Sequence, residues 1–196
     1  DMIAHARQLL ADGKILAIKG SGGFHLACDG MNKTAVSTLR RRKLRVDKPF
    51  ALMMADVATV KKHCHLNAAE EALLTSRERP IVILERREGS GIATAVSPNQ
   101  HTVGVMLPYT PLHLLLLEHA PNFTDALVMT SGNVSDEPIA PDNDDARERL
   151  ATLADAFLMH NRDIHTCCDD SVMRISTANT PSPLRRSRGY APFPVK

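Results

Sequence analysis

Apolar segments of strand length alternate with helix-like segments along almost the whole chain, and short connections join them. Strands are expected at 13–20, 49–54, 80–85, 101–108 and 125–133, and helices at 2–12, from Asn32 into the basic cluster, and at 57–64, 67–76, 110–120 and 142–151. This alternation predicts an α/β sheet domain. Three further strands, expected at 155–160, 171–176 and around 182–187, follow without intervening helices. The sheet is therefore predicted to be mixed rather than purely parallel.

Length, charge and cysteine content limit the kinds of protein that this chain could be. The chain has 196 residues, enough for one α/β domain, and a net charge of only +2, so anion binding must come from local clusters. No segment approaches the roughly 18 consecutive apolar residues of a membrane span, and the start shows no export signal. Four cysteines without repeated spacing favour reduced thiols in a cytoplasmic protein. Asp1 in place of an initiator Met suggests one domain, 1–196, taken from a longer chain.

The strongest charge cluster lies at 39–54, with Asp47 as its only acid. Its cations are Arg40, Arg41, Arg42, Lys43, Arg45 and Lys48. In an extended segment Lys43 and Arg45 point the same way, and together with Lys48 they can hold a polyphosphate. A solvated helix end that complements the helix dipole is the alternative, and it suits Arg40–Arg42. A nucleic-acid patch is a third interpretation, weakened by an aromatic content of only 4%.

Two segments with small or polar residues follow expected strands. Gly20, Gly22 and Gly23 allow backbone amides to approach a phosphate closely, although the segment matches neither the Walker pattern nor the dinucleotide fingerprint, and a plain tight turn fits as well. Ser131 and Asn133 flank Gly132 and offer neutral hydrogen-bonding groups to a ligand, or a simple polar turn.

The segment 160–174 concentrates residues that could bind a metal. His160, His165, Cys167, Cys168 and Asp169 lack the paired spacing of a zinc site, which argues against zinc. Asp169 and Asp170, beside Ser171, could carry Mg²⁺ or orient a basic neighbour. A second cationic group follows near the end of the chain, at Arg185, Arg186 and Arg188. Residue chemistry alone thus predicts a phosphate or nucleotide site.

Six segments taken together resemble the YrdC-like domain of HypF, the carbamoyltransferase used in maturing nickel–iron hydrogenases. They are "KGSGGFHLACDG", "RRKLRVDKPFALMM", "VGVMLPYTPLHLLL", "MTSGNVSDEPI", "HNRDIHTCCDDSVMR" and "RRSRGYAP". The resemblance runs from about Lys14 to Pro192. It implies a twisted mixed sheet with flanking helices around an open basic cavity. It also implies a module separated from the acylphosphatase, zinc-motif and transferase domains of a full-length HypF.

The activity that this resemblance implies is ATP-dependent. Carbamate derived from carbamoyl phosphate reacts with ATP, with Mg²⁺ bridging the phosphates, to give carbamoyl-adenylate and pyrophosphate. A neighbouring HypF domain then passes the carbamoyl group to the C-terminal cysteine of HypE. Such an enzyme module has ATP, carbamate and HypE as partners and no membrane partner.

The resemblance also implies roles for individual residues. The family's Lys-x-Arg pair corresponds to Lys43 and Arg45, and its Ser-x-Asn motif to Ser131 and Asn133, all as nucleotide-binding residues. Lys48 and Ser171 are placed near the phosphates, and either Arg186 or Arg188 is expected to face the nucleotide. The candidate catalytic residues are His25, for carbamate, with Lys43 and Arg45; a packed structural histidine is the alternative for His25.

Three other functions remain open. Threonylcarbamoyl-adenylate synthases share the family, but the arginine that they use near bicarbonate or threonine corresponds to Met106 here, which favours carbamate chemistry. Antibiotic O-carbamoyltransferases share the same core. A non-catalytic RNA-binding module could use the same basic cavity.

Overall fold

A computed structural model describes residues 1–118, 123–133, 137–140 and 142–192. Within these ranges the chain forms a nine-stranded sheet with the order β7-β1-β2-β6-β3-β5-β4-β8-β9. The strands are β1 (Leu16–Lys19), β2 (Phe24–Asp29), β3 (Ala51–Met53), β4 (Ile81–Glu85), β5 (Thr102–Met106), β6 (Leu127–Ser131), β7 (Ala156–Leu158), β8 (Val172–Ile175) and β9 (Pro181–Arg185). The pairs β1–β7, β3–β5 and β4–β8 are parallel and the other neighbours are antiparallel. The predicted mixed α/β sheet is confirmed.

The helices form where the sequence places caps and apolar stripes. They are α1 (Met2–Ala11), α2 (Lys33–Arg42), α3 (Val57–His63), α4 (Ala68–Thr75), α5 (Pro111–Leu117) and α6 (Asn143–Arg149), with a 3₁₀ turn η1 at Thr94–Val96. Asn32 caps α2 as expected, because its side chain accepts the N–H groups of Thr34 and Ala35. The described helices are at most 10 residues long, and none of them could cross a bilayer.

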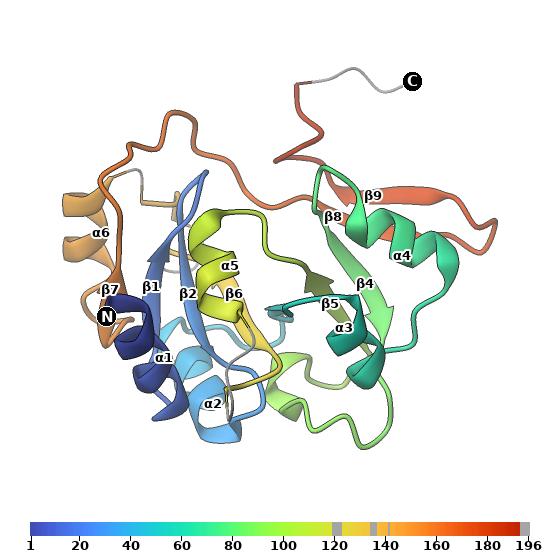
Figure 1. The fold of residues 1–196 in the computed structure, drawn as a ribbon, viewed down its shortest axis with the longest axis horizontal. Coiled ribbons are helices and arrows are strands. Elements are labelled where there is room, and N and C mark those ends of the chain that lie inside the picture. Colours follow the sequence, from blue (N-terminus) through green and yellow to red (C-terminus); the bar gives the residue numbers. More distant parts are fainter. Residues whose placement is uncertain (119–122, 134–136, 141, 193–196) are drawn as a thin grey trace.

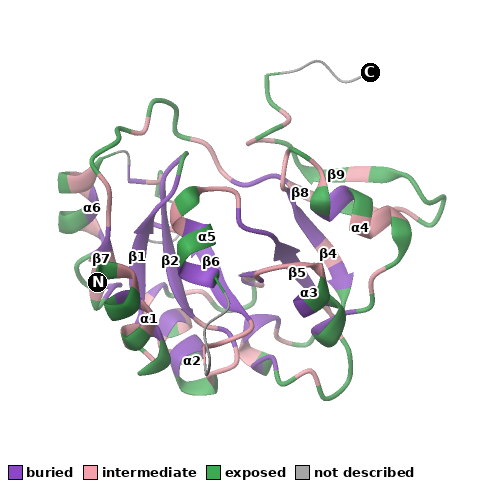
Figure 2. Cartoon of the chain, in the orientation of Figure 1, coloured by how far each residue is buried: buried purple, intermediate pink, exposed green. Residues whose placement is uncertain are grey.

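Apolar side chains form two clusters, one on each face of the sheet. Most of the strands between them are buried (Figure 2). Because strand side chains alternate between faces, Leu52 of β3 joins the cluster under α2, whereas Ala51 and Met53 join the cluster under α1 and α5. Helices α1 and α5 lie together over the strands β1, β2 and β6 in Figure 1. This second face is left partly uncovered by helices, and the site described below occupies that part.

One strand was not expected from the sequence. No strand was predicted between Gly23 and Asn32, but the glycines form a tight hairpin turn that is followed by the buried strand β2. The N–H of Gly20 donates to the carbonyl oxygen of Gly23 (2.8 Å), which closes the turn. The tight-turn alternative is therefore the one observed. The helix expected at 110–120 ends at Leu117, and positions 119 and 120 lie outside the described residues.

Candidate functional site

The uncovered part of the sheet face forms a cavity of about 390 Å³. The strand register gathers small residues in its floor, since Ala51 of β3 pairs with Gly104 of β5. A Cβ atom on Gly104 would lie 2.7 Å from the side chain of Ile81, so only glycine leaves this hollow open. The surrounding floor is apolar and includes Phe50, Ile81, Ile83, Met129, Val172 and Leu184. Its volume and lining suit a small organic ligand.

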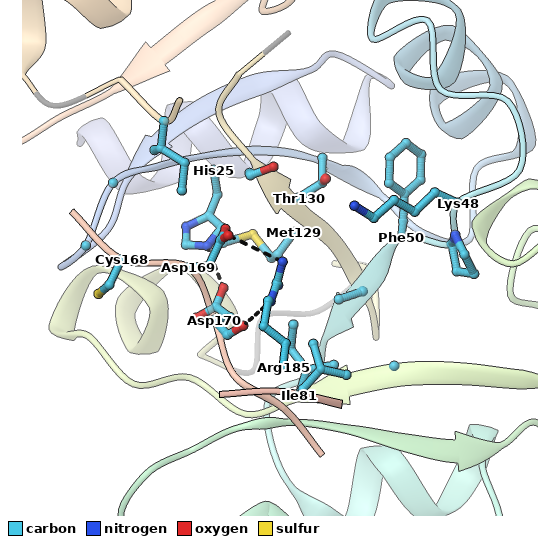
Figure 3. A pocket seen from close by; sticks show the side chains of 18 of the residues that line it. His25, Lys48, Phe50, Ile81, Met129, Thr130, Cys168, Asp169, Asp170 and Arg185 are labelled. Carbon is cyan, nitrogen blue, oxygen red and sulfur yellow. Dashed lines mark hydrogen bonds and ion pairs between the residues drawn. The ribbon is translucent and has the colours of Figure 1, made fainter. Parts of the chain in front are cut away.

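One wall of the cavity carries the predicted cations Arg45 and Lys48. Figure 3 shows Lys48 on this wall beside Phe50. The guanidinium of Arg45 donates to the carbonyl oxygens of Lys48 (2.8 Å) and Pro49 (2.6 Å) and lies 4.9 Å from the Phe50 ring centroid. Burial lowers the pKa of Arg45 to about 10, and the charges of Arg40 and Arg185 add to this effect. Arg45 is therefore held rigidly at the cavity with excess positive charge around it.

Lys43 lies behind this wall rather than in the cavity. Only 1% of its surface is exposed, and its Nζ donates to the carbonyl oxygens of Ser131 and Asn133 (both 2.7 Å) and to Asn133 Oδ1 (3.1 Å). Burial lowers the pKa of the Lys43 ammonium to about 8, with Arg45 and Lys48 contributing further. The ammonium thus fixes the turn after β6. It does not line the cavity, contrary to the expectation that Lys43 and Arg45 would point the same way.

The predicted Ser-x-Asn pair is brought together by this turn. Ser131 lines the cavity, and its hydroxyl donates to Asn133 Oδ1 (2.7 Å). Asn133 does not line the cavity; its Nδ2 donates to the carbonyl oxygen of Glu137. Gly132 between them packs against β2, where a Cβ atom would lie 2.7 Å from the carbonyl oxygen of Phe24. Ser131 is therefore presented to the cavity, and Asn133 supports it from behind.

His25, at the inner end of the cavity, is bound to a carboxylate. Its Nε2 lies 2.9 Å from Asp170 Oδ2, and its Nδ1 is buried without a hydrogen-bond partner among the described residues. Tyr109 and His113 lie next to it, with the His113 ring centroid 6.0 Å away. Burial lowers the pKa of His113 to about 3. The His25 ring lines the cavity, but neither of its nitrogens is open to solvent.

Arg185 supplies the cation of the opposite wall (Figure 3). Its Nε donates to the carbonyl oxygen of Asp170 (2.9 Å), and its Nη1 lies 3.4 Å from the carboxylate of Asp169. Sequence reasoning named Arg186 or Arg188 for this position, and neither lines the cavity. Arg186 donates to Tyr190, while Arg188 binds Asp170 and lies 3.5 Å above the Tyr109 ring.

A β-bulge explains why Arg185 was missed. The pairing of β8 with β9 shifts register between Val172 and Met173. The shift breaks the simple alternation of side chains, so that both Leu184 and Arg185 reach the cavity. Strict alternation of side chains along a strand does not predict that two adjacent residues face the same cavity. The sequence therefore showed the cluster of arginines but not which of them lines the cavity.

Ser171 and the first arginines of the basic cluster have structural contacts. The Ser171 hydroxyl is fully buried, donates to the carbonyl oxygen of Arg188 (2.9 Å) and accepts the N–H of Ser187 (2.8 Å). It is therefore placed away from the cavity lining, contrary to expectation. Arg40 donates to the carbonyl oxygens of Arg45 and Val46. Arg40 thus shapes the loop that carries the cavity cations and is more than a solvated helix end.

The chain is similar in sequence and in fold to proteins that are already known. The profile of the Sua5, YciO and YrdC family, described as telomere recombination, matches residues 8–187. Carbamoyltransferase HypF2 of Cupriavidus necator is 46% identical over 210 residues, covering 100% of this chain and 26% of HypF2. A crystal structure of full-length HypF in a phosphate- and nucleotide-bound form superposes with a TM-score of 0.92 at 50% identity, over 97% of this chain and 30% of that one.

A second branch matches less well. Threonylcarbamoyl-AMP synthase of Mus musculus is 28% identical over 130 residues, covering 65% of this chain and 45% of that protein. Met106, taken from the sequence as a sign against that branch, is fully buried in the cluster under α1 and α5 and does not line the cavity. Its position therefore says little about the substrate. The chain spans about a quarter of the length of the HypF relatives that it matches.

Proposed function

Because the chain belongs to the Sua5, YciO and YrdC family and resembles one part of HypF, we propose that its cavity binds ATP and activates carbamate as carbamoyl-adenylate. Three cations from two separate parts of the chain, Arg45, Lys48 and Arg185, line one cavity. This convergence is the observation that carries the proposal, since a triphosphate is the ligand that several fixed cations bind best.

The cavity has a place for each part of the ligands. The triphosphate lies between Arg45 and Lys48 on one wall and Arg185 on the other, with the Ser131 hydroxyl as a neutral donor. The base rests on the apolar floor beside Ala51 and Gly104. Carbamate enters toward the inner end, beside His25 and Tyr109, whose rings shape that end.

The reaction needs positioning and charge neutralisation more than covalent chemistry. A carbamate oxygen attacks the α-phosphorus, the bond to the bridging oxygen breaks, and pyrophosphate leaves with the bond electrons. The fixed guanidinium groups of Arg45 and Arg185 neutralise the charge that develops on the leaving group. Lys43 acts from behind, by holding the turn that presents Ser131.

Mg²⁺ fits this cavity as a partner of the phosphates. Of the two predicted acids, Asp170 is buried and bound to His25 and Arg188, whereas the half-exposed Asp169 has a longer contact of 3.4 Å with Arg185 and would be the carboxylate ligand. No group of three or more metal-binding side chains occurs among the residues that the structure describes. A magnesium ion held by one carboxylate and the phosphates matches the usual chemistry of nucleotide sites, and it would neutralise phosphate charge.

The degree of similarity supports a proposal for the pathway. The match to HypF is higher in identity and covers more of this chain than the match to threonylcarbamoyl-AMP synthase. We therefore place the chain in a longer cytoplasmic carbamoyltransferase, in which other HypF domains supply carbamate and pass the carbamoyl group to HypE. Threonylcarbamoyl-adenylate synthesis and antibiotic O-carbamoylation are the related alternatives.

The test is carbamate-dependent exchange of labelled pyrophosphate into ATP. We expect exchange by the chain, together with binding of a non-hydrolysable ATP analogue by calorimetry. Arg45→Ala and Ser131→Ala should reduce both signals while circular dichroism stays unchanged. Exchange that needs threonine and bicarbonate instead would assign the chain to the other branch. Tight, salt-dependent binding of duplex RNA without any nucleotide binding would support the RNA-binding alternative.

A further inference from the structure

The segment before β8 joins two strands that lie far apart in the sheet. Strands β2 and β8 are separated in the sheet order by β6, β3, β5 and β4. Even so, Asp170 contacts His25 of β2, and the N–H of Cys168 donates to the carbonyl oxygen of Gly22 (3.0 Å). Residues 168–170 therefore cross from one side of the cavity to the other and close its inner end. We call them the crossing segment.

Asp170 is the most connected residue of the crossing segment. One carboxylate oxygen binds His25 Nε2 (2.9 Å), the other accepts Arg188 Nε (2.8 Å), and the main-chain carbonyl oxygen accepts Arg185 Nε (2.9 Å). Its surface is only 8% exposed. Burial alone would raise the pKa of this carboxyl, but the hydrogen bonds and charges of His25 and Arg188 outweigh burial and hold the pKa below its ordinary value. The side chain of Asp170 is thus a carboxylate that accepts one hydrogen bond from His25 and one from Arg188.

The contact fixes His25 as well as the crossing segment. A carboxylate only accepts hydrogen bonds, so Nε2 of His25 must carry the hydrogen. The opposite edge of the ring lies against the hairpin turn, where a Cβ atom on Gly20 would be 3.2 Å from Nδ1. The ring is therefore held between Asp170 and the turn.

We propose that Asp170 is a positioning residue that closes the inner end of the cavity by binding His25, and so keeps water from the activated carbamoyl group. This inference rests on the proposed function, because a carbamoyl-adenylate is the species that needs protection. When water attacks the carbamoyl carbon, AMP is expelled and carbamate is returned, so that ATP is consumed without transfer. An enclosed cavity favours the reverse reaction with pyrophosphate instead.

The test compares two aspartates that each bind a histidine. Asp170→Asn leaves one acceptor oxygen for two donors, so the bonds from His25 and Arg188 cannot both persist. Asp125→Asn is the matched control, because Asp125 binds His63 Nε2 at the same 2.9 Å but does not line the cavity. The measured quantity is net AMP formation relative to pyrophosphate exchange.

For Asp170→Asn we expect this ratio to rise about tenfold, the effect of losing one charge-assisted hydrogen bond, and to stay unchanged for Asp125→Asn. NMR should show the His25 Nε2–H or the Arg188 Nε–H signal lost in Asp170→Asn. An unchanged ratio, or both signals retained, would overturn the inference. Absence of exchange in the unmodified chain would instead overturn the proposed function, while the NMR comparison would still test the contact.

A second pair of variants keeps the inference testable if Asp170→Asn does not fold. His25→Gln places an amide donor near Asp170, whereas His25→Leu has no donor. We expect the ratio to rise further for Leu than for Gln. Equal ratios in these two variants would overturn the role of the contact.

Discussion

Each of the two walls of the cavity has a cation that faces the cavity and a second cation behind it. The walls differ in the groups that bind the second cation. On each wall a cation faces the cavity, Arg45 on one side and Arg185 on the other, and a second cation lies behind it. Behind Arg45, Lys43 is bound by neutral carbonyl and amide oxygens. Behind Arg185, Arg188 is bound by the carboxylate of Asp170. Lys43 and Arg45 thus bind neutral oxygens on the first wall, whereas Arg185 and Arg188 form ion pairs with Asp169 and Asp170 on the second.

This difference indicates a division of labour. Arg185 is also partly neutralised by Asp169, so most of the attraction for an anion comes from the wall of Arg45 and Lys48. The paired wall contributes shape and stability instead. Substitutions on the two walls measure this contrast.

Arg45→Ala should weaken binding of an ATP analogue about a hundredfold, because it removes a rigid, half-buried charge that is held at the cavity by neutral carbonyl oxygens. Calorimetry measures the affinity. Arg41→Ala is the matched control, since Arg41 is an exposed cation of the same basic cluster and does not line the cavity. Similar losses of affinity in both variants would mean that the overall positive charge of the basic cluster attracts the ligand, and not the position of Arg45 at the cavity.

Arg185→Ala should weaken binding about tenfold, a smaller loss because Asp169 already compensates part of its charge. Arg174, an exposed arginine of β8 that does not line the cavity, provides the control substitution. A loss equal to that of Arg45→Ala would contradict the asymmetry of the two walls.

Raising the pH should weaken binding through Lys43. Its pKa is about 8 in the folded chain and 10.5 in the unfolded reference. If binding requires the ammonium form, affinity should fall about fivefold between pH 8 and 9, in proportion to the fraction of Lys43 that stays protonated. The Lys43→Met variant should bind weakly with a flat profile over the same range, and a parallel decline in that variant would assign the effect to another group.

The same shift has the opposite sign for stability. Between pH 8 and 10.5 the unfolded chain binds more protons at Lys43 than the folded chain does, so the contribution of this group to the free energy of unfolding rises with pH. Denaturant titrations of the parent and of Lys43→Met at pH 7.5 and 9.5, compared with each other, isolate this contribution. A parent that loses more stability than the variant over this range would show that Lys43 remains charged.

Ser171→Ala should have the smallest effect on binding, since the hydroxyl lies away from the cavity. It should lower the free energy of unfolding by about 1–3 kcal/mol, because a buried donor and acceptor both lose a partner. Urea denaturation and calorimetry on one sample separate the two outcomes. A large loss of affinity at constant stability would return Ser171 to the ligand site.

Most of the strands and helices, and some of the residues that line the cavity, could be predicted from the sequence. Alternating apolar patterns located β3 to β6 and the helices to within a few residues, because those patterns follow directly from burial on one or two faces. Strand β2 was missed because glycines before it suggested a loop, although Phe24, Leu26 and Cys28 alternate into one core. The expectation of an open basic cavity came from the resemblance to the YrdC-like domain and not from the sequence pattern.

Side-chain direction was the part that the sequence could not provide. Lys43 and Arg45 are two positions apart, but Lys43 is the C-cap residue that follows α2, and Leu44 comes next with a φ of +51°. This backbone turn sends the ammonium behind the wall and the guanidinium into it. Likewise, Arg186 or Arg188 was expected at the cavity, but Arg185 lines it instead. This outcome depends on a bulge and on Asp170, which binds Arg185 and Arg188 from 15 and 18 residues away in the sequence.

The contact between His25 and Asp170 has a consequence for how the chain acquires its site. It joins residues 145 positions apart, and the pairing of β1 with β7 spans a similar length. Contacts of such long range form late and slowly, since a long loop must close before they can stabilise anything. A partly folded chain, or one still emerging during synthesis, has the cations of the basic cluster but no closed cavity around them. Nucleotide binding would thus report completed folding, and a bound nucleotide would in turn favour the finished structure by mass action.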